Sequence, residues 1–181
     1  MGQYYKPIIL KEKEDKPKRW FYSWDYDNGM KLMEHSYLAN NFVGVVCNQL
    51  INKPNRLVWA GDYADIEKDT EGTGYEGRGQ NLYELAADNL KSRAKKQYDN
   101  KKYHILVNHT AKQFVDTNNI KPDEDGWEIH PLPLLTVEGN GRGGGDYHGE
   151  NPHIGMWARD VIEVTTKAPD GYEEIKPEFH E

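Results

Sequence analysis

Two glycine-rich segments carry the side chains in this chain that are best suited to binding a ligand. The longer one, from Gly139 to Gly149, reads GNGRGGGDYHG, and the shorter one is Gly77-Arg78-Gly79. Gly-Arg-Gly occurs in both, with Arg142 at the centre of the second copy. Glycine destabilises a regular element by roughly 0.5–1 kcal/mol relative to alanine. This density of glycine therefore indicates tight turns, or a backbone that approaches a ligand closely.

If the two segments meet in space, they form an anion pocket. An arginine guanidinium binds phosphate or carboxylate in a bidentate manner, and amides at a helix start favour anions. We therefore predict that both loops lie at the same end of the sheet and bind a small anionic ligand, a nucleotide being the best-fitting class. The expected ligand-binding residues are Arg78, Asn140, Gly141, Arg142, Gly143, Gly144, Asp146 and Tyr147. The alternative is that both segments are solvated surface loops.

The longer segment also matches the pattern G-x-G-x-x-G, at Gly139, Gly141 and Gly144. In a dinucleotide-binding fold that loop opens a helix whose N-terminus faces the pyrophosphate. Here Pro152 and a predicted strand follow the loop instead. The sequence therefore argues against a Rossmann fold.

A second candidate site consists of acids and histidines. Oxygen and imidazole ligands suit Mg, Mn or Zn, and the same groups can act as general acid and base in a metal-assisted hydrolase. No H-E-x-x-H spacing fixes two ligands on one element. We predict no cofactor, with a divalent metal as the alternative. Its candidate ligands are Asp62, Asp65, Asp146 and His148, with His153 nearby in sequence.

Composition limits the remaining possibilities. The net charge of −7, with no long basic block, argues against non-specific binding to nucleic acid, which needs many lysine and arginine contacts to phosphate. No leader-like segment opens the chain and no apolar run approaches the ~20 residues of a membrane helix. The single cysteine, Cys47, excludes an intramolecular disulfide. We expect a cytoplasmic protein with no membrane association, and a protein-interaction or inhibitor domain is the third functional hypothesis.

Hydrophobic periodicity predicts one α+β domain spanning residues 1–181, with a polar, frayed tail from about residue 167. Helices are expected at about 41–52 and 81–98, the second starting with a capping box of Asn81 and Glu84. A hairpin is expected across 20–34 around Asp27-Asn28-Gly29. Strands are predicted at 3–10, 56–60, 103–107, 112–116, 134–137 and 156–165, the last two flanking the longer glycine-rich segment. These elements give a largely antiparallel sheet with two main helices.

The chain resembles a family of uncharacterised small bacterial and phage-borne proteins that open with Gly-Gln-Tyr-Tyr. The resembling segments are Gly2 to Tyr5, Lys31 to Glu34, Trp59 to Asp65, His130 to Asp146 and Trp157 to Asp160. The resemblance covers most of the length and implies a single intact domain. It implies no activity, ligand or catalytic residue.

Overall fold

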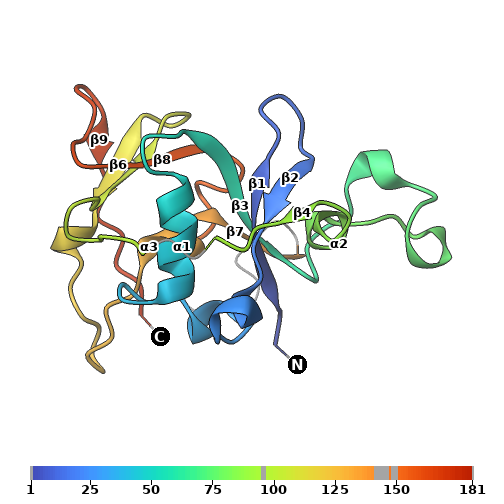
Figure 1. Ribbon diagram of the computed structural model, residues 1–181, viewed down its shortest axis with the longest axis horizontal. Helices are drawn as coiled ribbons and strands as arrows, with labels where there is room; N and C mark the ends of the chain where they lie inside the picture. The colour runs from blue at the N-terminus through green and yellow to red at the C-terminus, as the bar shows by residue number, and fades with distance from the viewer. Residues whose placement is uncertain (1, 95–96, 141–146, 148–150, 181) are drawn as a thin grey trace.

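The computed structural model describes residues 2–94, 97–140, 147 and 151–180. Within these residues the chain forms a nine-stranded mixed sheet with three α-helices (Figure 1). The strands are β1 (Tyr5–Leu10), β2 (Pro17–Trp20), β3 (Asn55–Gly61), β4 (Leu90–Lys91), β5 (Ile105–Asn108), β6 (Gln113–Asp116), β7 (Val137–Glu138), β8 (Val161–Thr165) and β9 (Glu173–Glu174). The helices are α1 (Asn41–Gln49), α2 (Leu82–Ala86) and α3 (Pro131–Thr136). The prediction of a largely antiparallel α+β domain is confirmed.

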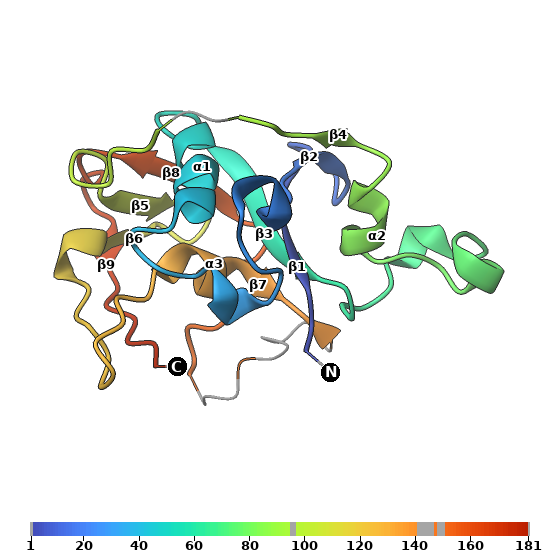
Figure 2. The same cartoon turned by 60° about the horizontal axis from the view of Figure 1, so that its bottom comes forward.

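The strands follow the order β4-β2-β1-β3-β8-β5-β6-β9, and β7 pairs with β3 off this path. The central pairs are antiparallel, whereas β2 with β4, β3 with β7 and β6 with β9 are parallel. Both views place α1 and α3 beside the half of the sheet that holds β5 and β8. They place α2 and the long loop before it at the other end (Figures 1 and 2). Among the residues described, no helix combines the length and apolarity needed to cross a bilayer.

Helix α1 confirms the prediction for residues 41–52, apart from its last turn. Asn40 caps it, since its side-chain oxygen accepts hydrogen bonds from the amides of Phe42 at 2.9 Å and Val43 at 3.2 Å. The helix contributes Phe42 and Val46 to the main core, where both are fully buried. Asn52 then adopts a positive φ of 51°, which turns the chain toward β3.

The helix expected at 81–98 is wrong in length, because α2 ends at Ala86. Its predicted capping box is present: Asn81 and Glu84 each accept a hydrogen bond from the other's amide. The chain then turns into β4, which pairs in parallel with β2. The Trp20 indole donates to the carbonyl of Asn89 at 3.2 Å. Pairing with a distant strand has therefore overridden the local helical periodicity.

Helix α3 replaces most of the strand expected at 134–137. Proline is tolerated in the first helical turn because the amides there have no intrahelical acceptor, and Pro131 occupies the first position. His130 caps the helix, its Nδ1 accepting from the amide of Leu132 at 3.1 Å. A residue that precedes proline is disfavoured in the helical conformation, and His130, before Pro131, is indeed extended, whereas Leu132, before Pro133, is helical.

The hairpin expected across 20–34 is also wrong. Strand β2 ends at Trp20, and Ser23–Tyr26 forms a 3-10 helix that ends at Asp27 with φ 57°. Phe21 is fully buried and the Tyr26 ring packs on Phe42 at 5.6 Å. In a strand, Phe21 and Tyr26 would lie on opposite faces, yet the core buries both. A strand with one solvated face would not allow this.

Two C-terminal boundaries also differ from the prediction. The strand expected at 156–165 begins only at Val161, after a series of turns. The tail expected to fray instead adds β9 to β6, and the amide of Ile175 donates to the carbonyl of Phe114 at 2.9 Å. Phe179 is 7% exposed and joins the main core. The C-terminal segment therefore closes one end of the sheet.

Two histidines are buried in the core in their neutral form. His35 Nδ1 lies 3.0 Å from the carbonyl of Gly29, while its Nε2 accepts a hydrogen bond from the Trp59 indole at 3.0 Å. This pair of partners requires a proton on Nδ1 and a lone pair on Nε2. Burial lowers the pKa of His35 to about 4 and that of His130 to about 3.

The His35 pKa predicts acid destabilisation. In the unfolded chain, His35 takes up a proton below about pH 6.5, whereas in the folded chain the imidazole stays neutral down to about pH 4. The free energy of unfolding therefore decreases as the pH is lowered through this window. Because one pKa unit is worth about 1.4 kcal/mol, lowering the pH from 7 to 4.5 should remove about 2–3 kcal/mol through His35. Urea unfolding of the wild type and of His35→Gln at both pH values measures this. Glutamine supplies the same donor and acceptor without titrating, so identical pH losses in the two proteins would refute the assignment.

Candidate functional site

The two glycine-rich loops start from neighbouring strands that run in the same direction. Strand β7 pairs in parallel with β3, with Val137 opposite Trp59 and Glu138 opposite Ala60. The chain thus leaves β3 at Gly61 and leaves β7 at Glu138 from the same edge. Carboxyl ends of parallel strands are a common place for ligand sites in sheets that contain them. We call this region, where the two loops begin, the loop junction.

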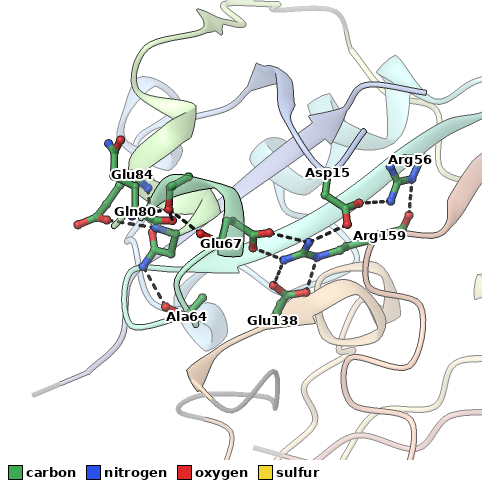
Figure 3. A network of polar contacts seen from close by, with 10 residues as sticks. Asp15, Arg56, Ala64, Glu67, Gln80, Glu84, Glu138 and Arg159 are labelled. Atoms are coloured by element: carbon green, nitrogen blue, oxygen red, sulfur yellow. Dashed lines mark hydrogen bonds and ion pairs between the residues drawn. The ribbon is translucent and has the colours of Figure 1, made fainter. Parts of the chain in front are cut away.

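Arg159 joins the two loops at the junction, as Figure 3 shows. Its guanidinium lies 2.5 Å (Nη2) and 3.2 Å (Nη1) from the carboxylate oxygens of Glu67, in the first loop. It also lies 2.8 Å (Nε) and 2.5 Å (Nη2) from the two oxygens of Glu138, at the end of β7. Both contacts have the bidentate geometry that makes arginine–carboxylate pairs strong. One cation therefore holds the starts of both loops.

Asp15 and Arg56 extend this network toward the surface. Asp15 lies 3.3 Å from Arg159 and 2.5 Å from Arg56, and the latter also donates to the carbonyl of Arg159 at 3.0 Å. The hydrogen bond from Arg56 lowers the pKa of Asp15, although partial burial opposes this. Burial alone would lower the pKa of Arg159, but its hydrogen bonds to Glu138 and Glu67 raise it. The network therefore favours the charged forms of Asp15 and Arg159.

The turn that carries Arg159 is fixed by the backbone on both sides. The amide of Trp157 donates to the carbonyl of Leu135 at 2.7 Å, and the amide of Arg159 donates to the carbonyl of Leu57 at 2.8 Å. Arg159 itself adopts a φ of 70°, a conformation that non-glycine residues rarely take. These backbone contacts impose the strained conformation. The conformation in turn directs the Arg159 side chain between the two loops.

Arg159 was not predicted as a site residue, because the alternation across 156–165 predicted a regular strand there. The signal for it in the sequence was an arginine between Trp157, which the structure buries, and the apolar strand residues that follow it.

Arg78, the first predicted anion ligand, lies on the surface at the start of α2. Its side chain is 51% exposed and forms an ion pair with Glu84. The loop before it is ordered by hydrogen bonds, such as those from Thr70 Oγ1 to the carbonyls of Glu67 at 2.6 Å and Gln80 at 3.0 Å. Gly79 has a φ of 87°, and a Cβ there would lie 2.4 Å from Ile66. Backbone conformation and packing thus account for this glycine.

A row of aromatic rings and lysines runs from α2 across β1 and β2. Lys6 lies 3.7 Å from the ring centroid of Tyr83 and 4.7 Å from that of Trp20. Lys91 lies 5.8 Å from the Trp20 centroid and 5.4 Å from that of Tyr22. Tyr22 in turn stacks on Trp24 with centroids 6.3 Å apart. We call these six residues the aromatic row: Lys6, Trp20, Tyr22, Trp24, Tyr83 and Lys91.

Lys6 links this row to the junction loops. Its ammonium donates to the carbonyl of Tyr83 at 3.1 Å, and burial lowers its pKa to about 8, while Asp62 and Glu84 oppose that shift. Glu84 therefore acts on both Lys6 and Arg78. Trp24, at the far end of the row, is 65% exposed and offers a free ring face to solvent.

The remaining predicted residues are only partly described. Asn140 is exposed, and the half-buried Tyr147 packs edge to face on Phe179 with centroids 6.4 Å apart. Asp62 accepts a hydrogen bond from the amide of Tyr4 at 3.0 Å, and Asp65 is half-buried. Within the described residues no three His, Cys, Asp or Glu side chains come together as metal ligands. The remaining predicted ligands lie outside the described residues: Gly141, Arg142, Gly143, Gly144, Asp146 and His148.

Removing Arg159 should destabilise the fold strongly. The Glu67 and Glu138 side chains are only 9% and 4% exposed, and breaking a buried ion pair costs about 3–5 kcal/mol. Arg159→Met should therefore lower the free energy of unfolding in urea by about that amount. Arg78→Met is the matched control, because its exposed pair with Glu84 should contribute no more than about 1 kcal/mol. Equal losses in the two variants would contradict the role given to Arg159.

Comparison of the chain with protein-family models, with curated proteins and with solved structures finds no match.

Proposed function

We propose that this protein binds a small anionic ligand, of the nucleotide class, between its two glycine-rich loops. The observation that carries the proposal is the parallel pairing of β3 and β7, from which both loops start side by side. Arg159 links the two starting points through Glu67 and Glu138. Each loop contains a Gly-Arg-Gly sequence, so this arrangement favours two guanidinium groups that act on one ligand.

Arg159 is not itself an anion ligand in this proposal. Its donors are already engaged by three carboxylates, those of Glu67, Glu138 and Asp15. Arg78 is the accessible cation, held by a carboxylate that is itself partly exposed. An incoming phosphate would take the place of Glu84 on Arg78, with Arg142 as the second cation.

The aromatic row supports a ligand that also carries a planar ring. Tyr83 follows the Arg78 loop directly in α2, and Trp20 lies beyond it across Lys6. Stacking of a nucleobase on such a ring contributes about 1–3 kcal/mol to binding, whichever base it is. A phosphate at Arg78 and a base on these rings would lie on neighbouring parts of one surface.

Calorimetric titration with nucleoside mono-, di- and triphosphates in metal-free buffer tests the proposal. Arg78→Ala and Arg142→Ala should each lose about 1.5–3 kcal/mol of binding free energy, or roughly 10- to 150-fold in affinity, as for hydrogen bonds to charged groups. Glu84→Gln should bind more tightly than the wild type, because it keeps the capping box but removes the competing charge. Arg93→Ala, an exposed arginine outside both segments, is the control and should bind normally.

Urea unfolding of the same variants separates a loss of ligand affinity from a loss of fold stability. Unchanged affinity of Arg142→Ala together with a lowered urea midpoint at unchanged slope would make Arg142 a structural residue. No binding heat and no thermal shift of the wild type with any of these nucleotides would refute the proposed function, because a ligand at 100 times its Kd stabilises by about 2.7 kcal/mol.

A further inference from the structure

His109 lies between a phenol and a carboxylate at the opposite end of the sheet. Its Nε2 is 2.6 Å from Glu163 Oε2, and its Nδ1 is 2.9 Å from the hydroxyl of Tyr172. The imidazole and phenol rings meet edge to face with centroids 5.7 Å apart. His109 directly follows β5, Glu163 lies in β8 and Tyr172 precedes β9, so the fold itself assembles the three groups.

The direction of proton donation follows from the chemistry of the partners. An ionised carboxylate only accepts, so the Nε2 atom of neutral His109 carries the proton that is shared with Glu163. Nδ1 then presents its lone pair to the hydroxyl of Tyr172, which donates. The order phenol, imidazole, carboxylate is that of a nucleophile, its general base and the group that orients the base.

The backbone around these residues holds them in register. Val107 pairs with Glu163 between β5 and β8, and the amide of His109 donates to the carbonyl of Val161 at 2.9 Å. The amide of Glu173 donates to the carbonyl of Lys112 at 3.0 Å, which fixes the residue after Tyr172. The His109 and Glu163 side chains are 28% and 18% exposed, so the site is partly shielded yet open to a small reagent.

We propose that Tyr172 is an activated nucleophile that accepts an acyl group from an ester. Its oxygen forms a bond to the acyl carbon while its proton passes to Nδ1 of His109, and the bond from the acyl carbon to the leaving oxygen breaks. His109 then returns the proton to that oxygen, which leaves as an alcohol. His109 is the catalytic base, and Glu163 is a positioning residue that stabilises the imidazolium. The proposal is independent of the anion site.

An aryl acetate, p-nitrophenyl acetate, is the probe, and peptide mass spectrometry after timed exposure of the folded protein locates the acetyl group. Tyr75, which is 75% exposed, is the reference phenol within the same molecule. If exposure alone governed reactivity, Tyr75 would react faster than the half-buried Tyr172. We expect Tyr172 to be acetylated at least about tenfold faster, as general-base assistance contributes about 10²–10⁴-fold.

Two variants separate activation from structure. His109→Gln and Glu163→Gln should slow acetylation of Tyr172 to the rate of Tyr75 or below, while leaving Tyr75 unaffected. Nitrogen-15 NMR of the imidazole should show a proton on Nε2 and a lone pair on Nδ1 in the wild type, the tautomer that the proposed base requires. Acetylation of Tyr172 no faster than Tyr75 in the wild type overturns the proposal without any variant. So does a fast reaction that persists in a folded His109→Gln protein.

Discussion

The ion pairs of Arg159 with Glu67 and Glu138 are the interaction on which the organisation of the loop junction depends. Glu67 belongs to a loop with little regular structure, and Glu138 ends a strand only two residues long. A cation that contacts both carboxylates in a bidentate manner couples the two elements, because moving either of them away would break a buried ion pair.

The same need to satisfy buried polar groups shapes the core. Trp59 lies in the central strand β3, and its indole donates to a histidine that must stay neutral to accept it. His130 similarly uses its Nδ1 to cap α3, whose six residues are all buried. Because α3 leads directly into β7, this cap also positions Glu138. The neutral core histidines and the charged junction are therefore parts of one arrangement around β3 and β7.

Sequence patterns predicted the elements whose stability is local. Helix α1 has its cap at Asn40 and its apolar face within one short segment, and the capping box of α2 joins Asn81 to Glu84, in the first turn of that helix. The patterns failed where distant partners decide. The segment after Ala86 leads into strand β4 and not into a longer helix, because it pairs with β2. Helix α3 forms in a proline-rich stretch because His130 caps its N-terminus.

The candidate sites follow the same division. The glycine and arginine residues of the two loops were visible in the sequence, which predicted that the loops lie at the same end of the sheet. Arg159 was not, since its partners lie 92 and 21 residues away. The Glu163–His109–Tyr172 arrangement was likewise hidden, because 54 and 63 residues separate His109 from its two partners.

Hydrogen exchange of the Arg159→Met protein, compared with the wild type, tests the coupling of the two loops most directly. The relevant amides are those of Glu67 and Thr70, which bond to the carbonyls of Gln80 and Glu67, and those of β7. If Arg159 couples the loops, protection should fall in both groups together. Loss of protection in only one group, or in neither, would contradict the account.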